Sequence, residues 1–127
     1  MKQEVRDWDF VADTAARKFS APYFLKALSE ISPDDVPRSA VSKLRSFSKF
    51  TKLRALKIVA AQIAFHKSCI ESAQAKCAYV KGPALSVQFD GNYAERYCRD
   101  IDVLVHEHDF EKVILEAVSN GYRVILS

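Results

Sequence analysis

The residues from Thr51 to Cys77 include no glycine and no proline, so nothing in this stretch interrupts a regular helix. Side chains that can face a core recur along it at steps of three and four residues, at Leu56, Val59, Ile63, His66, Ile70, Ala73 and Cys77. Residues with this spacing lie on one face of an α-helix. The pattern predicts one long amphipathic helix whose stripe faces the core, with His66 as a hydrogen-bonded member of the stripe rather than a ligand.

The rest of the first half is also typical of helices. A stripe from Trp8 to Phe19 predicts a first helix, and Pro22 separates it from a second, short one. The residues Ser32-Pro33-Asp34-Asp35 combine an N-cap, a proline at the first helical position and acidic residues in the first turn. Helical spacing then continues from Val41 to Phe47.

The pattern changes at Ala78, where short strand-like runs alternate with short helices. We predict strands at 78–81, 101–105 and 122–126, and helices from Pro83 to Phe89 and from His108 to Asn120. The sequence therefore predicts an α+β protein, in which a helical region, 1–77, precedes a β-α-β-α-β region, 78–127.

Two aspartates, Asp100 and Asp102, lie at the head of the apolar run Val103-Leu104-Val105. Successive side chains of a strand point to opposite faces, so both carboxylates would project from one face while Ile101 and Val103 face the core. Adjacent carboxylates repel each other unless a cation shares them, and hard oxygen ligands suit Mg²⁺. The pair is the best indication of function in the chain.

The net charge is only +3, but the basic residues are concentrated in one segment. Residues 38–57 include seven basic side chains and no acidic one, namely Arg38, Lys43, Arg45, Lys49, Lys52, Arg54 and Lys57. Such a segment is either a solvated helix face or a surface that binds phosphates.

Neither secretion nor membrane insertion is predicted. No apolar run reaches the roughly 20 residues that span a bilayer, and the N-terminus has no apolar signal region. The three cysteines, Cys69, Cys77 and Cys98, lack CxxC spacing and are expected to be reduced thiols. We expect a cytoplasmic protein with no membrane partner.

The order of these motifs resembles the nucleotidyltransferase superfamily of the DNA polymerase β type, and within it a bacterial group of uncharacterised nucleotidyltransferases. That group carries Lys-Gly-x-x-Leu, then an arginine ahead of Asp-Ile-Asp-Leu-Leu-Val, then a helix and Gly-Tyr or Gly-Phe. The matching positions here are Lys81, Gly82, Leu85, Arg96, Asp100 to Val105, Gly121 and Tyr122. The resemblance extends from Tyr79 to Val124 and implies a truncated polymerase β-like core with a small mixed sheet.

The resemblance also implies an activity: transfer of a nucleoside monophosphate from an NTP, such as ATP, to a hydroxyl acceptor. Asp100 and Asp102 would be the catalytic pair and the shared ligands of two Mg²⁺ or Mn²⁺ ions, which stabilise the attacking and leaving oxygens. Gly82 would let backbone amides approach the triphosphate at a helix N-terminus. The other expected nucleotide or phosphate contacts are Lys81, Arg96 and Arg99.

Two features depart from the superfamily. Pro83 follows Gly82, where a serine usually supplies a hydroxyl and an N–H. The third carboxylate, usually carried by a later strand, has no counterpart before Ser127. We therefore expect either the front part of a longer protein or a reduced version of the domain.

Two other functions are compatible with the sequence. The Arg38–Lys57 segment could hold nucleic acid, in which case the affinity would fall steeply with salt. Alternatively, the fold could be an antitoxin-like docking module for a protein partner. An exposed strand at Tyr122–Leu126 would also allow a homodimer through edge-to-edge pairing.

Overall fold

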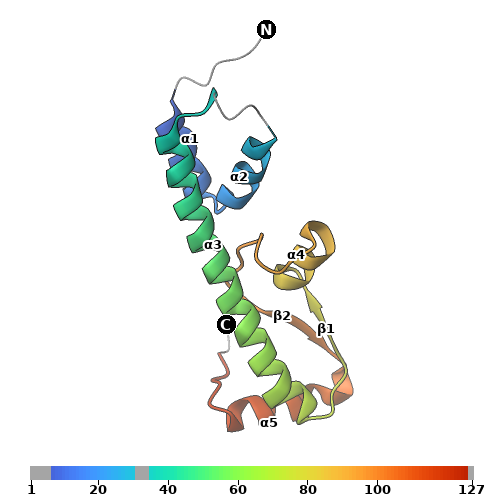
Figure 1. Cartoon of the computed structure of the whole chain (residues 1–127). Coiled ribbons are helices and arrows are strands. Elements are labelled where there is room, and N and C mark those ends of the chain that lie inside the picture. Colours follow the sequence, from blue (N-terminus) through green and yellow to red (C-terminus); the bar gives the residue numbers. More distant parts are fainter. Residues whose placement is uncertain (1–6, 31–34, 126–127) are drawn as a thin grey trace.

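One long helix, α3 (Arg38–Phe65), runs through the molecule, and the other elements lie along it (Figure 1). The computed structural model describes residues 7–30 and 35–125. The helix α3 continues without a break into one π-helical turn, η2 (His66–Glu71). The segments predicted as helical at 41–47 and 51–77 are thus one helix, and it ends at Glu71 rather than Cys77. The predicted helix start at 32–35 lies mostly outside the described residues, and α3 begins after Pro37.

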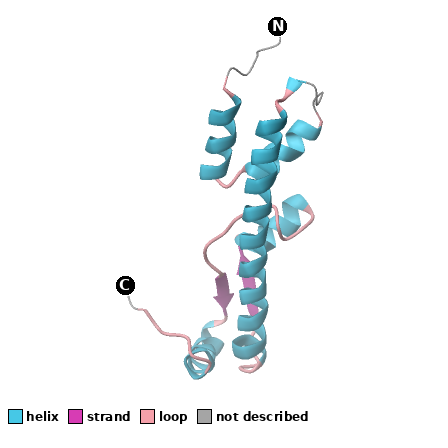
Figure 2. Cartoon of the chain, turned by 60° about the vertical axis from the view of Figure 1, so that its left-hand side comes forward, coloured by secondary structure: helices cyan, strands magenta, loops and turns pink. Residues whose placement is uncertain are grey.

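Two short helices, α1 (Trp8–Arg17) and α2 (Ala21–Ser29), cover the N-terminal half of α3 (Figure 2). The carboxylate of Asp7 caps α1 by accepting a hydrogen bond from the Phe10 N–H at 2.9 Å. Pro22 lies in the first turn of α2, where a missing N–H costs nothing. The core of this end consists of the buried residues Ala12, Ala15, Ala21 and Leu44.

The other end of α3 carries a two-stranded antiparallel sheet, β1 (Cys77–Val80) and β2 (Asp102–Val105). In its register Cys77 is opposite Val105, and Val80 is opposite Asp102. The helix α4 (Gly82–Asp90) connects the strands, and α5 (Glu107–Ser119) follows β2. A second core lies here, formed by the buried residues Cys69, Ile70, Val113 and Ala117. The division of the chain into 1–77 and 78–127 stays a prediction.

The α+β class is confirmed, but the predicted mixed sheet is wrong for the described residues. Residues 122–125 form no strand, and Leu126 lies outside the described part. The Tyr122 N–H instead donates to the Ala117 carbonyl at 3.0 Å, and the Tyr122 ring packs edge-on against Phe65. Beyond these contacts the chain leads away from α3 and from both strands (Figure 2). A homodimer through this segment stays a prediction, with no strand at 122–125 to pair.

The predicted buried stripe of the long helix is wrong at two of its largest residues. Leu56 is 49% exposed and Ile63 is 51% exposed. The helix α3 buries another face, which carries Ala40, Leu44, Ser48, Thr51 and Ala55. These residues are mostly small, which suits the close approach of neighbouring helices. The side chain of His66 is hydrogen-bonded as predicted, since its Nδ1 lies 2.9 Å from the Tyr79 hydroxyl.

Candidate metal and phosphate site

The aspartate pair lies where β2 begins. Asp102 is the first residue of β2, and Asp100 precedes it by two residues. Along the strand, exposed Asp102 and Leu104 alternate with half-buried Val103 and Val105, as predicted. Both carboxylates are open to solvent and therefore accessible to a ligand.

The turn between β1 and α4 has an unusual backbone. Lys81 has φ 60° and ψ −161°, and Gly82 has φ 45°. Glycine adopts such angles readily, whereas for lysine they cost roughly 1–3 kcal/mol. Strained residues of this kind concentrate at ligand sites. The Lys81-Gly82 turn is therefore a candidate ligand contact on conformational grounds alone.

Gly82 brings this turn against the aspartate segment. A Cβ built on Gly82 would lie 3.1 Å from the Cys98 sulfur and 3.9 Å from the Asp100 carbonyl oxygen. No side chain fits at that distance without a shift of the neighbouring atoms. The close approach joins the Lys-Gly motif to the Asp-Ile-Asp motif.

A lysine ammonium already faces one of the carboxylates. The Lys81 Nζ lies 3.4 Å from the Asp102 Oδ2, and the two side chains are 74% and 45% exposed. An exposed pair of this kind contributes about 0–1 kcal/mol, so a ligand can displace it at little cost. The ion pair places a positive charge where phosphate oxygens would meet the aspartates.

Both aspartates also act on the neighbouring thiol. Burial raises the pKa of Cys98, and the negative charges of Asp100 and Asp102 raise that pKa further. The Cys98 thiol therefore remains protonated at neutral pH and is a packing group rather than a nucleophile. The shared influence on one sulfur indicates that the two carboxylates lie in the same neighbourhood.

The donor set fits Mg²⁺ in the company of phosphates. Asp100 and Asp102 supply hard oxygen donors, and Mg²⁺ is usually held by one or two carboxylates together with substrate phosphates. Within residues 7–30 and 35–125, no three His, Cys, Asp or Glu side chains form a metal-binding group. The pair therefore suits a metal ion that arrives bound to a triphosphate. It does not suit an ion whose ligands all come from the protein.

Arg96, one of the expected phosphate contacts, is engaged elsewhere. Its Nε donates to the Asp90 Oδ2 at 3.1 Å, and the Tyr23 hydroxyl donates to the same oxygen at 2.9 Å. The ammonium of Lys52 pairs with Glu95 at 3.3 Å. These bonds hold the 91–99 loop against α2 and α3, so Arg96 supports the site from outside.

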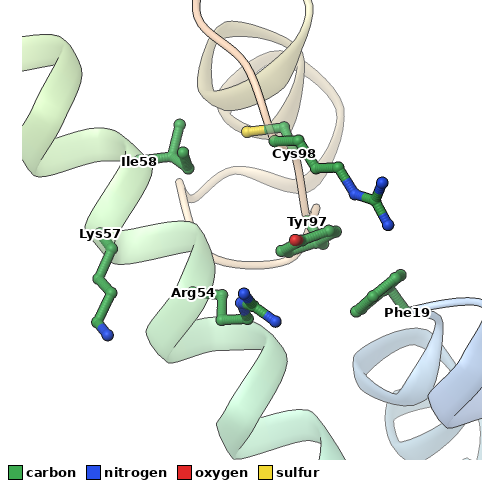
Figure 3. Close-up of a pocket in the computed structure, with 7 residues that line it drawn as sticks. Phe19, Arg54, Lys57, Ile58, Tyr97 and Cys98 are labelled. Carbon is green, nitrogen blue, oxygen red and sulfur yellow. The ribbon is translucent and has the colours of Figure 1, made fainter.

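A pocket lies beside the aspartate segment, between α3 and the 97–99 segment (Figure 3). Its volume is about 460 Å³, and its basic lining residues are Arg54, Lys57 and Arg99. The Lys57 side chain points away from Arg54 and Tyr97, so its ammonium does not face the cavity (Figure 3). The remaining lining residues are Phe19, Ile58, Tyr97 and Cys98. Arg99 is thus the expected phosphate contact that reaches a cavity, and it is the residue directly before Asp100.

An aromatic stack fixes one wall of this pocket. The rings of Phe19 and Tyr97 are stacked with centroids 4.1 Å apart, and the Arg54 guanidinium lies 5.5 Å from the Tyr97 centroid. The guanidinium also lies 5.2 Å from the Phe50 ring centroid. The cation–π contacts orient Arg54 toward the pocket without neutralising its charge.

A family model described as "Uncharacterised nucleotidyltransferase" matches residues 4–125, nearly the whole chain. The chain belongs to this nucleotidyltransferase family. A search of curated proteins found no match, and neither did a search of solved structures. The family match extends well beyond Tyr79 to Val124 and includes α1, α2 and α3, so it covers both ends of the molecule.

For this family member, the structure unites the Lys81-Gly82 turn with the aspartate pair and adds residues that the motifs did not reveal. Arg54 and Lys57 were part of the basic segment, but nothing in the sequence distinguished them from their neighbours. Their spacing of three residues on one helix is shared by Lys49 and Lys52, so it gave no separate signal. In the part of the chain that the structure describes, no helix is both long and apolar enough to cross a membrane.

Proposed function

We propose that this chain carries the metal- and nucleotide-binding half of a nucleotidyl transfer site, which moves a nucleoside monophosphate from an NTP to a hydroxyl acceptor. The acceptor oxygen forms a bond to the α-phosphorus, and the bond from that phosphorus to the pyrophosphate oxygen breaks. The hydroxyl proton leaves to water, which reaches both exposed carboxylates.

The main support for this proposal is the contact between Gly82 and the Cys98–Asp100 segment. It brings a strained turn with a lysine to within reach of two carboxylates. A triphosphate at the turn would lie between the Lys81 ammonium and the aspartates. Catalysis of this kind depends largely on positioning and charge stabilisation.

Each residue then has a separate task. Asp100 and Asp102 would hold Mg²⁺, which when bound neutralises charge on the phosphate and pyrophosphate oxygens. The Lys81 ammonium would release the Asp102 carboxylate and bind a phosphate oxygen instead. The Gly82 turn allows close backbone approach at the start of α4, although Pro83 contributes no N–H there.

Isothermal titration with ATP and the other NTPs, with and without Mg²⁺, tests the proposal. The wild type is expected to bind at least one NTP, with an affinity that falls when EDTA removes the metal. Asp100→Asn/Asp102→Asn should lose the metal-dependent part of the affinity. The matched control Glu30→Gln/Glu111→Gln also removes two exposed carboxylates but lies outside the site, and should bind as wild type.

Equal NTP affinity in the wild type and the aspartate variant, at equal thermal stability, would overturn the proposal. A loss of NTP binding in the Glu30→Gln/Glu111→Gln control would contradict it as well. That result would show that net charge alone governs the affinity.

A further inference from the structure

Two arginines of the pocket beside Asp100 lack a carboxylate partner. Arg54 and Arg99 line one cavity, and neither makes an ion pair with another residue in the described part of the chain. Two other basic residues near the site are paired, since Lys52 pairs with Glu95 and Lys81 pairs with Asp102. Like charges that converge without an acid repel one another, and an anion removes that cost.

The chemistry of the walls selects a phosphate group rather than a nucleobase. The guanidinium groups of Arg54 and Arg99 each present paired N–H donors, which match the oxygens of a phosphate. The Tyr97 ring has Phe19 stacked on it and Arg54 close by, so it is already engaged by its neighbours. The apolar remainder, Ile58 and Cys98, offers no hydrogen-bonding edge for base recognition.

The pocket is separate from the turn assigned to the NTP. None of Lys81, Gly82, Asp100 and Asp102 lines it. The two sites share the Cys98–Arg99 segment, because Cys98 contacts Gly82 and also forms part of the pocket wall (Figure 3). A ligand with its phosphate in the pocket can therefore extend past Arg99 toward Asp100.

We propose that the pocket lined by Arg54 and Arg99 binds the phosphate of the acceptor, so that the acceptor is a phosphorylated alcohol or sugar. The identification of the ligand as the acceptor rests on the proposed function. Phosphate binding in the pocket does not depend on it. The bound phosphate orients a hydroxyl of the same molecule toward the aspartate pair, where that hydroxyl attacks the α-phosphorus and pyrophosphate leaves.

Calorimetric titration of the whole chain with inorganic phosphate and with glycerol 3-phosphate, in buffer without Mg²⁺, tests the site. The wild type should bind both, and Arg54→Gln/Arg99→Gln should weaken both by about tenfold or more, as expected for lost hydrogen bonds to a charged group. Arg99→Gln alone leaves the contact of Arg54 with Tyr97 intact and should also weaken both. The charge-matched control Arg45→Gln/Lys49→Gln, on α3 like Arg54 but outside the pocket, should bind as wild type.

Equal phosphate affinity in the wild type and in the folded Arg99→Gln variant would overturn the inference. A second arm uses Mg²⁺ with ATP, which the pocket variants should bind with wild-type affinity. If they lose ATP and phosphate in parallel, the pocket holds the triphosphate of the NTP and the acceptor assignment is wrong. If Asp100→Asn/Asp102→Asn binds Mg²⁺-ATP as wild type yet phosphate binding still depends on Arg99, the proposed function fails while the phosphate site stands.

Discussion

Gly82 and Cys98 lie so close that a methyl group on the glycine would be 3.1 Å from the cysteine sulfur. The contact joins the start of α4 to the segment that leads into the aspartate pair. It also places a protonated, uncharged thiol between two motifs that are far apart in the sequence. The geometry of the candidate site therefore depends on the absence of a Cβ at Gly82.

Replacement of that glycine should be costly. Gly82→Ala introduces a Cβ at φ 45° and against the Cys98 sulfur, and we expect a loss of about 2–4 kcal/mol in the free energy of unfolding. Denaturant titration followed by circular dichroism measures the loss. NTP affinity should fall as well, because the turn shifts away from Asp100.

Two further variants separate backbone strain from the contact. Gly91 has φ 76° but nothing within 4 Å of an added Cβ, so Gly91→Ala should cost only about 1–2 kcal/mol. Cys98→Ala should recover part of the loss when combined with Gly82→Ala. Equal losses for Gly82→Ala and Gly91→Ala, with no recovery, would show that the Cys98 contact is unimportant.

Lys81 should show a conflict between stability and binding. Lys81→Gly relieves the strained φ, and this gain outweighs the added freedom of the unfolded chain and the lost surface ion pair. We expect a net gain of about 0.5–1 kcal/mol in the free energy of unfolding. NTP affinity should nevertheless fall about tenfold, because a charged phosphate contact is lost.

The control for this experiment is Lys81→Ala, which removes the ammonium but keeps a Cβ at the strained position. Its stability should not exceed that of the wild type, while its NTP affinity should match that of the glycine variant. Wild-type NTP affinity in either variant would exclude Lys81 from the site.

Alkaline pH should destabilise the protein through its tyrosines. The pKa of Tyr23 is raised from 10.0 to about 12, chiefly by burial and next by its hydrogen bond to Asp90. The folded state therefore holds this proton more tightly than the unfolded state. The resulting stabilisation is complete below pH 10 and is lost as the pH rises through 12.

Tyr23→Phe removes this contribution, so its stability should decline less between pH 10 and 12 than that of the wild type. Thermal unfolding at a series of pH values measures the difference. Tyr79, whose pKa burial also raises to about 12, remains in the variant and accounts for a residual decline. Identical pH profiles for the variant and the wild type would contradict the role of Tyr23.

A buried hydroxyl in α4 should be dispensable. The Ser86 side chain is fully buried, and its oxygen has no hydrogen-bond partner among the described residues. Ser86→Ala removes an unsatisfied polar group, so the free energy of unfolding should rise by about 1 kcal/mol. The matched control Ser68→Ala removes a hydroxyl that donates to the Ala64 carbonyl at 2.8 Å, and should give no such rise. Destabilisation by Ser86→Ala would mean that this hydroxyl has a partner.

The alternation along β2 was predictable because it depends only on the two-residue repeat of a strand. Exposed Asp102 and half-buried Val103 follow from that repeat once the segment is extended. The face of α3 that is buried was not predictable in the same way. The helix carries apolar residues on two sides, and Leu56 and Ile63 lie on the side that no described element covers.

The sequence by itself determined the local elements: the long helix, the turn at Gly82, the strand that carries Asp102 and the helix that ends before Gly121. These depend on backbone preferences and on periodicity within a few residues of each position. Only the tertiary structure decided what meets across the chain, including the Gly82 contact with Cys98, the pocket that unites Arg54 with Arg99, and the lack of a strand at 122–125. Such contacts form between segments distant in sequence, and packing geometry rather than local propensity selects them.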